Sequence, residues 1–281
     1  ARPELFDKAM RSEADAISID LEDAVVEDRK AQARQIVGDW LRQRERQAND
    51  KLIIARVNAM DTPHFAQDVA AVVQPGLDVL NLPKPASAQA VREAVQLIAQ
   101  AEKNNGVKQP IRLLLNIETP KALREAAQLG QADPRVMGLQ VGLGDLFEPL
   151  GIERREVAAV QQVMLAVRLA AGEAGVDAFD GAFANVADTD GYLAEAQLAH
   201  RMGLSGKTCI HPSQIALANQ VFRPTDAQIR HAKKVVEAAR QFDAAGQGAF
   251  LVDGHMIDVP FLRRAENILA QAQRLNISLT A

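Results

Sequence analysis

The 281-residue sequence contains a single cysteine, Cys209, so an internal disulfide is excluded and a reducing compartment, the cytoplasm, is expected. Aromatic residues make up only 4% of the chain, which leaves little for a base-stacking platform. Lysine and arginine are scattered and the formal net charge is −4, which argues against a nucleic-acid surface. No apolar run approaches the ~20 residues of a membrane span, and no signal peptide is visible. We therefore expect a protein with neither a nucleic-acid nor a membrane partner.

Short apolar runs of strand type alternate with amphipathic segments along most of the chain. Nearly continuous apolar runs are typical of strands buried on both faces of a parallel sheet. Amphipathic segments such as Asp28–Arg46 and Arg154–Ala174 lie between them and predict helices. The expected strands are Ala16–Leu21, Leu52–Val57, Val79–Leu82, Ile111–Ile117, Val136–Leu143, Ala178–Phe183 and Lys207–Ile210. This alternation indicates repeated βαβ units.

The fold class that best accommodates this rhythm is α/β, as a (β/α)₈ TIM barrel. Seven runs are one short of a closed barrel, and the chain opens directly into a loop and helix at Arg2–Lys8. We therefore expect the first strand to precede Ala1, although a seven-stranded doubly wound sheet is the alternative fold. A barrel of ~250 residues forms one domain. The catalytic barrel is assigned to residues 1–222 and a C-terminal extension to residues 223–281.

The C-terminal extension has local signals of its own. Thr225-Asp226-Ala227-Gln228 reads as a capping box that opens a helix reaching Phe242. Asp253-Gly254 suits a type I′ turn, so the segment around it predicts a β-hairpin, and Pro260 then starts a final helix. An appendage that does not complete a core often covers a site or a neighbouring subunit, and we expect one of these roles for this extension.

Almost every predicted strand finishes in a polar residue. Successive residues of this kind are separated by about one βα unit of ~30 residues. In a barrel they would converge on the carboxyl-end face, where such enzymes place their active sites. The alternative is a set of ordinary loop charges and helix caps. The residues are Glu22-Asp23, Arg56 with Asn58, Lys84, Glu118, Asp145, Asp180 and His211 with Gln214.

Two of these residues, Glu118 and Asp145, end neighbouring strands and predict a metal site. Mg²⁺ typically takes one or two protein carboxylates and completes its octahedron with water and substrate oxygens. No cluster of histidine and cysteine suggests zinc. The alternative is that each carboxylate caps the helix that follows it.

Arg56 can fork onto a carboxylate or carbonyl oxygen, or form an ion pair with Glu22 or Asp23, and both roles can coexist. Lys84 is expected to make an ion pair or a substrate contact rather than a Schiff base, which requires a desolvated amine. His211 either supplies an acid or base or acts as a structural hydrogen-bond hub.

The ordered motifs together resemble the citrate lyase beta-chain-like family of acyl-CoA lyases, related to malyl-CoA and citramalyl-CoA lyases of the HpcH/HpaI aldolase superfamily. The resemblance runs from about Arg2 to Ala272, and its specificity lies in the joint order and spacing. The motifs are Ile19-Asp20-Leu21-Glu22-Asp23-Ala24, Arg56-Val57-Asn58, Leu82-Pro83-Lys84, Ile117-Glu118-Thr119, Gly142-Leu143-Gly144-Asp145-Leu146, Ile210-His211-Pro212-Ser213-Gln214 and Met256-Ile257-Asp258.

The resemblance implies a TIM barrel with a strand ahead of Arg2 and with Mg²⁺ held by Glu118 and Asp145. Arg56 would bind the carboxylate or carbonyl of a 2-keto acid. The tail would reach over an adjacent subunit, usually in a homotrimer, and present Asp258 as the acid. Gly144 stands where an acidic or polar residue is frequent, and Asn185 where an acid is common. These departures leave the substrate open.

The expected reaction is Mg²⁺-dependent cleavage or formation of a 3-hydroxy-3-carboxy acyl thioester such as malyl-, citramalyl- or citryl-CoA, with a 2-keto acid and an acyl-CoA as the other partners. Asp258 would exchange a proton with the thioester α-carbon. Glu22, Asp23 and Lys84 would orient Arg56 and bound water, and Arg2 would meet the CoA phosphates. An acyl-carrier protein can replace free CoA. Two alternatives are a CoA-independent, metal-dependent pyruvate aldolase and a catalytically silent barrel subunit.

Overall fold

The computed structural model describes residues 2–44, 51–243, 249–275 and 277. The chain divides into two compact units, Ala1–Val221 and Phe222–Ala281. The first unit contains a parallel sheet with its covering helices, and the second contains a hairpin between two helices. The strand-end residues discussed above all belong to the first unit, whereas Asp258 belongs to the second.

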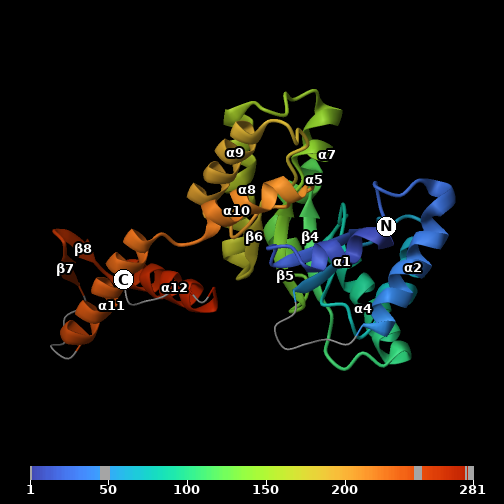
Figure 1. Cartoon of the computed structure of the whole chain (residues 1–281), viewed down its shortest axis with the longest axis horizontal. Coiled ribbons are helices and arrows are strands. Elements are labelled where there is room, and N and C mark those ends of the chain that lie inside the picture. The colour runs from blue at the N-terminus through green and yellow to red at the C-terminus, as the bar shows by residue number, and fades with distance from the viewer. Residues whose placement is uncertain (1, 45–50, 244–248, 276, 278–281) are drawn as a thin grey trace. The chain divides into compact units, whose positions relative to one another are not determined.

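The first unit is built on a six-stranded sheet in which every neighbouring pair is parallel and the strands follow in sequence order. The sheet curls into a half-barrel with helices along its outside (Figure 1). Both faces of its central strands are buried, which explains their continuous apolar sequence. The strands are β1 (Ala16–Asp20), β2 (Leu52–Arg56), β3 (Val79–Leu82), β4 (Arg112–Ile117), β5 (Val136–Val141) and β6 (Asp177–Phe179).

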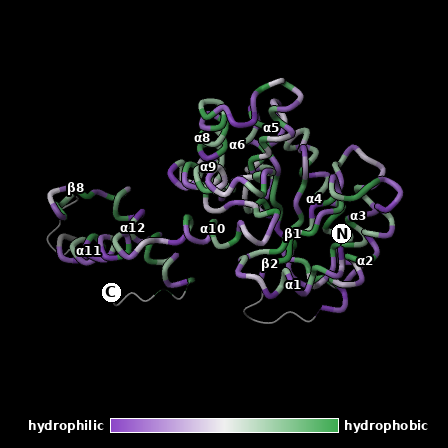
Figure 2. The backbone as a smooth tube through the Cα atoms, turned by 45° about the horizontal axis from the view of Figure 1, so that its top comes forward, coloured by the Kyte–Doolittle hydropathy of each residue, from purple (hydrophilic) through white to green (hydrophobic). Residues whose placement is uncertain are grey.

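Helices α2 to α8 of the first unit connect consecutive strands, whereas α1 precedes β1 and α9 and α10 follow β6. Among the connecting helices, α2, α3, α4, α6 and α8 pack each against the next, so they follow the strand order. Figure 2 shows the strands as mainly hydrophobic and the outer helices as mixed, as one-sided burial requires. The α-helices are α1 (Phe6–Met10), α2 (Lys30–Gln43), α3 (Phe65–Val72), α4 (Ala88–Asn105), α5 (Pro120–Arg124), α6 (Ala126–Gly130), α7 (Leu143–Phe147), α8 (Val157–Ala174), α9 (Thr189–Arg201) and α10 (Pro212–Phe222). Short 3₁₀ helices are η1 (Pro3–Leu5), η2 (Glu27–Arg29) and η3 (Glu148–Leu150).

The seventh expected strand, Lys207–Ile210, is reduced to one parallel bridge between Asp180 and Lys207. The Lys207 ammonium is fully buried between Asp180 and Glu195, 2.8 Å from the Glu195 Oε1. Three residues later, the Ile210 backbone N–H donates to the Gln214 side chain instead of a neighbouring strand. Backbone pairing with the β6 segment extends only from Ser205 to Thr208, so the prediction of a strand over Lys207–Ile210 is wrong.

One helix of the described residues, α8, is long and apolar enough to cross a membrane by length and composition alone. Its buried face, which includes Val160, Met164 and Val167, packs against α6 and the strands β5 and β6. This one-sided packing is that of the amphipathic outer helix expected from the sequence.

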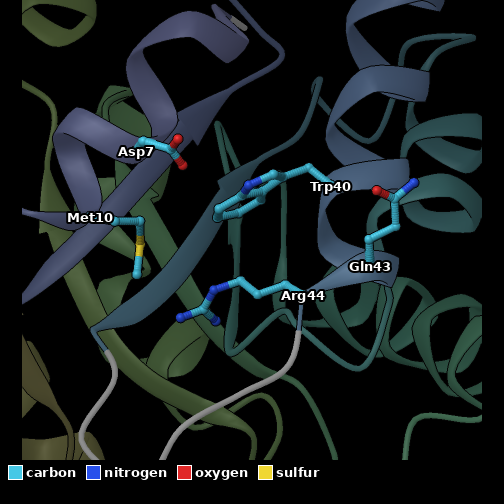
Figure 3. Close-up of a pocket in the computed structure, with 5 residues that line it drawn as sticks. All are labelled: Asp7, Met10, Trp40, Gln43 and Arg44. Carbon is cyan, nitrogen blue, oxygen red and sulfur yellow. The ribbon is translucent and has the colours of Figure 1, made fainter.

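A shallow crevice of about 240 Å³ lies between α1 and α2 (Figure 3). The only tryptophan, Trp40, lines it; its ring meets the Phe6 ring at 5.0 Å and has the Arg44 guanidinium 5.7 Å from its centroid. α1 leads into the start of β1, and α2 precedes the start of β2. The crevice therefore lies toward the amino ends of the strands, away from the polar strand-end residues.

The second unit contains α11 (Asp226–Asp243), the antiparallel strands β7 (Phe250–Val252) and β8 (His255–Ile257), and α12 (Val259–Arg274). The expected capping box is present, since the Gln228 N–H donates to Thr225 Oγ1 and the Thr225 N–H donates to Gln228 Oε1. Asp253 and Gly254 have φ values of 49° and 81°, as a type I′ turn requires. Residues of α11, the hairpin and α12 share a small core of Ala232, Val235, Val252, Ile257 and Ala265.

Candidate active site at the carboxyl ends of the strands

The polar residues predicted at strand ends meet at the carboxyl edge of the sheet. Glu22 and Asp23 follow β1, and Arg56 is the last residue of β2. Lys84 and Glu118 follow β3 and β4, and Asp145 lies in the first turn of α7 after β5. Parallel strands bring these positions to one edge, although 123 positions separate Glu22 from Asp145 in the sequence.

Arg56 is held by carboxylates from the β1 end. Its Nε and Nη2 donate to the two Asp20 oxygens at 2.8 and 2.6 Å, a bidentate pair. Its Nη1 lies 2.8 Å from Glu22 Oε2 and 3.3 Å from Asp23 Oδ2. The expected pairing with Glu22 and Asp23 is therefore present. The geometry fixes the guanidinium plane and leaves it charged, since these carboxylates raise the Arg56 pKa despite its burial.

Lys84 joins the two halves of the cluster. Its ammonium lies 3.5 Å from Glu22 Oε1 and 3.6 Å from Asp145 Oδ2. Its φ is 46°, in the left-handed region that a non-glycine residue adopts at a cost. Burial alone would lower the Lys84 pKa, but Glu22 and Asp145 raise it above its usual value. A protonated amine is a poor nucleophile, so an ion-pair role is favoured over a Schiff base.

Glu118 and Asp145 are not helix caps. Thr119, rather than Glu118, caps α5 by accepting the Ala122 N–H, and Asp145 lies within α7, whose N-cap is Gly142. Glu118 is only 3% exposed, and its Oε1 accepts the Lys84 backbone N–H at 3.0 Å. Asp145 is more open, with 42% of its side chain exposed. The pair thus places one buried and one accessible carboxylate beside Lys84.

The site has an excess of negative charge that perturbs its acids. The pKa of Glu118 is raised to about 7 by burial and by the nearby carboxylates Glu22 and Asp145. The pKa of Glu22 is also raised by burial, which outweighs the opposing charge of Arg56. Burial would raise the pKa of Asp20 too, but its hydrogen bond and ion pair with Arg56 lower it. Burial therefore raises the pKa values of Glu118 and Glu22, whereas the bidentate arginine contact lowers that of Asp20.

Close packing fixes Glu118 from the β5 side. A Cβ at Gly142 would lie 2.5 Å from Glu118 Cβ and 2.7 Å from its Oε2, so only glycine fits there. Gly144, two residues on, has open space within 4 Å of where its Cβ would be. The Glu118 side chain therefore requires a glycine at position 142, whereas packing does not require one at position 144.

The residues present fit a divalent cation. Five carboxylates, Asp20, Glu22, Asp23, Glu118 and Asp145, face two cations, Arg56 and Lys84. The Lys30 ammonium, which binds the Glu22 backbone carbonyl, raises the number of cations only to three. Among the described residues, no group of three or more His, Cys, Asp or Glu side chains could hold a metal. Mg²⁺ needs only one or two carboxylates when water and substrate supply the remaining oxygens.

A groove of about 350 Å³ opens beside Lys84, between the loop after β2 and the helix α4. Met60, Phe65, Ala90 and Leu97 give it a largely apolar lining, with the carboxylates of Asp61 and Glu93 also in its wall. Lys84 both lines this groove and contacts Glu22 and Asp145, so the groove lies next to the carboxylate cluster.

Several expected site residues lie outside the ion-pair cluster. Arg2 is exposed at the start of η1, and His211 is exposed with its Nδ1 2.8 Å from Ser213 Oγ. Asp180 pairs with buried Lys207 instead. Asp258 lies at the N-cap position of α12 in the second unit, where no hydrogen-bond donor among the described residues reaches its buried Oδ1.

Asp20 is the site residue that the sequence interpretation missed. It ends β1 in register with Arg56 at the end of β2, so their side chains leave the same face of adjacent strands. It also accepts the Glu22 and Ala24 N–H groups and so shapes the loop that carries Glu22. The sequence signal for Asp20 is an acidic residue directly at the end of the apolar run of β1, two and three residues before the acids Glu22 and Asp23.

Comparison with known proteins identifies the family of the chain. Residues 1–212 match the family model described as HpcH/HpaI aldolase/citrate lyase. The chain is 29% identical over 304 residues to an L-malyl-CoA/beta-methylmalyl-CoA lyase of Rhodobacter capsulatus, covering 99% of this chain and 93% of that protein. It is 33% identical over 266 residues to the citrate lyase subunit beta of Leuconostoc mesenteroides subsp. cremoris, covering 92% and 86%.

A crystal structure of the protein CitE from Mycobacterium tuberculosis in complex with magnesium, acetoacetate and coenzyme A superposes with a TM-score of 0.74. It is 31% identical and covers 97% of this chain and 94% of that chain. The resemblance read from the strand-end motifs is confirmed, and the chain belongs to the HpcH/HpaI aldolase/citrate lyase family.

Proposed function

We propose that this protein is a Mg²⁺-dependent carbon–carbon lyase that cleaves or forms a 3-hydroxy-3-carboxy acyl thioester, with a 2-keto acid and an acyl-CoA as the other partners. The observation that carries the proposal is the surplus of carboxylates at the strand ends, together with the Glu118 pKa of about 7. Bringing a divalent cation to Glu118 and Asp145 offsets this surplus. The names of relatives and neighbours, which include magnesium, coenzyme A and malyl-CoA, point to the same chemistry.

Glu118 and Asp145 would hold the metal. When bound, Mg²⁺ supplies Lewis acidity and a template for the substrate's hydroxyl and adjacent carboxylate. Glu118 must lose its proton to act as a ligand, and the exposed side of Asp145 leaves room for substrate and water. Lys84 lies against Asp145 and Glu22 and fixes both carboxylates in place.

Arg56 would bind the keto-acid oxygens. Its Nε and Nη2 are held by Asp20 and its Nη1 lies against Glu22 and Asp23, so a keto acid would reach Nη1 by displacing the longer, more exposed contact with Asp23. A guanidinium fixed in this way stabilises charge as it develops on the carbonyl oxygen during cleavage. Glu22 and Asp23 would orient the Arg56 guanidinium and so contribute to catalysis by positioning it. His211 and Arg2, both exposed, would contact the keto acid and the CoA phosphates.

Asp258 would be the acid–base group, presented to the site of a neighbouring subunit in a homo-oligomer, with three subunits as our proposal. In the condensation direction it would take a proton from the thioester α-carbon, and in cleavage return one. One observation supports this placement: the second unit exposes Leu251, Met256, Val259 and Phe261 by more than half. A cluster of exposed apolar side chains is suited to an interface.

The remaining proposals concern the closure of the barrel, the groove for the thioester, the acyl carrier and the location of the protein. A strand contributed ahead of Arg2 would close the half-barrel into a complete (β/α)₈ barrel, with residues 1–222 as its catalytic domain and residues 223–281 as the covering extension. The groove beside Lys84 would take the thioester arm, because its lining is apolar and its two acids disfavour the CoA phosphates. The carrier would be CoA or an acyl-carrier protein, and the location cytoplasmic.

The discriminating experiment offers the full-length protein both kinds of substrate. Malyl-CoA, citramalyl-CoA and citryl-CoA are incubated with it in Mg²⁺, and keto-acid release is followed; parallel reactions combine pyruvate with aldehydes in the absence of CoA. Release from a thioester supports the lyase. Aldol formation without any thioester cleavage would instead identify a CoA-independent aldolase, and inactivity in both would leave a silent barrel subunit.

A further inference from the structure

We propose that Asp68 and Lys30, which the reaction itself does not use, are positioning residues that hold the Glu22 loop and through it Arg56. This inference rests on the proposed function, because it assigns a purpose to a polar network that ends at the candidate site. The network runs through buried Asn58 from the α2–α3 interface to the backbone of Leu21 and Glu22.

The inner end of the network binds the Glu22 loop directly. The Lys30 ammonium donates to the carbonyls of Leu21 at 3.2 Å and Glu22 at 3.0 Å, and to Asn58 Oδ1 at 2.6 Å. The Asn58 side-chain amide donates to the same Leu21 carbonyl at 3.0 Å. These two carbonyls belong to Glu22, whose carboxylate meets Arg56 and Lys84, and to Leu21, the residue before it. The loop backbone is therefore fixed from behind, while its side chain faces the site.

The outer end of the network is the buried ion pair of Asp68 with Arg34. Asp68 is fully buried, and its Oδ1 accepts Arg34 Nε at 2.7 Å. Its Oδ2 accepts both the Asn58 backbone N–H at 2.9 Å and the Asn58 side-chain amide at 2.6 Å. Asn58 is thereby held in the one orientation that offers its oxygen to Lys30 and its nitrogen to Leu21.

The Asp68→Asn substitution tests this arrangement because all three partners of the carboxylate are donors. An amide at position 68 has one acceptor and one donor end, so in either orientation its NH₂ faces a donor. With the NH₂ in the Oδ2 place, the Asn58 side chain can relieve the clash only by turning, which breaks its contact with Lys30; with the NH₂ in the Oδ1 place, Arg34 loses its acceptor and Asn58 keeps its own. The Lys30→Met substitution breaks the inner end at a half-buried position and so provides a milder second variant.

Glu102→Ala is the matched control. Glu102 is also a buried carboxylate that accepts a backbone N–H, that of Ile111 at 2.7 Å, and pairs with Arg135 at 2.8 Å. It lies at the end of α4 that leads to the amino end of β4, and no contact of the described residues links it to the Glu22 loop. Its loss of stability should equal or exceed that of Asp68→Asn, since a buried N–H and a guanidinium both lose their acceptor.

The experiment measures three quantities in the full-length protein: Tm, keto-acid release with Mg²⁺, and amide hydrogen exchange in residues 21–26. Asp68→Asn and Lys30→Met are expected to lower kcat by about 10- to 100-fold and to accelerate exchange in residues 21–26, with Mg²⁺ affinity unchanged. Glu102→Ala is expected to have a lower Tm than the wild type but the same kcat and the same exchange rate in residues 21–26.

Activity losses that follow Tm across all three variants, or unchanged exchange in residues 21–26 of both Asp68→Asn and Lys30→Met, would overturn the inference. The exchange measurement decides the positioning role even when no thioester is cleaved by the wild type. Failure of the inference is thus distinguishable from failure of the proposed function.

Discussion

Replacing Gly142 by alanine tests the placement of Glu118 without changing any charged residue. The added Cβ would sit 2.5 Å from Glu118 Cβ and 2.7 Å from Glu118 Oε2. Carbon atoms prefer a separation of about 3.5–4.0 Å, so one of the two must move by about 1 Å. The Gly142 φ of −118° is open to alanine, so the effect is steric rather than conformational.

Overpacking of this kind costs about 1–3 kcal/mol of unfolding free energy. Displacing a metal ligand by about 1 Å is expected to reduce the rate about 10²-fold. Gly144→Ala is the control, because its Cβ meets no atom within 4 Å and an alanine inside α7 is favoured over glycine by ~0.5–1 kcal/mol. Titration calorimetry measures the Mg²⁺ affinity, thermal unfolding measures the stability and keto-acid release measures the rate. A folded Gly142→Ala variant with wild-type Mg²⁺ affinity and rate would show that Glu118 in this position is not a ligand.

Three further predictions address the remaining groups. In the metal-free protein, the folded Glu118 keeps its proton to a pKa of about 7 whereas the unfolded value is near 4.5, so the free energy of unfolding should fall with rising pH across this interval. Urea unfolding of Glu118→Gln should lack this component, which is on the order of 3 kcal/mol, and an identical pH slope in both proteins would contradict it. Arg56→Lys keeps the charge but loses the bidentate contact with Asp20, so kcat should fall about 10²- to 10³-fold with Mg²⁺ affinity retained; a rate within about threefold of wild type would refute the orienting role. Co-purified mixtures of Asp258→Asn and Asp145→Ala chains should recover about a quarter of wild-type activity if each site combines two subunits, whereas no recovery would place both groups in one chain.

The strands were predictable because their signal is local. β2 to β5 are nearly continuous apolar runs, and each ends within two residues of where the sequence placed it. The capping box at Thr225 and the turn at Asp253-Gly254 are likewise determined by neighbouring residues, and both are present. The grouping of polar residues at one edge follows from parallel strand order alone, so it could be anticipated.

What the sequence could not provide depends on contacts between distant segments. The Asp20–Arg56 pair depends on the register of β1 against β2, and the requirement for Gly142 depends on the Glu118 side chain from the neighbouring strand. The segment starting at Lys207 reads as a strand, yet its lysine is buried by Asp180 and Glu195 and only one bridge forms. In each case, a side chain from another element decides the outcome.

The most direct measurement is keto-acid release by the metal-stripped protein before and after Mg²⁺ is restored. The wild type and Gly144→Ala are expected to cleave at least one of malyl-CoA, citramalyl-CoA and citryl-CoA only when Mg²⁺ is present. Asp145→Ala and Glu118→Gln should remain inactive at the same Mg²⁺ concentration while retaining their fold. Equal cleavage without Mg²⁺, or by the Asp145→Ala variant, would contradict a lyase whose metal is held at the carboxyl ends of β4 and β5.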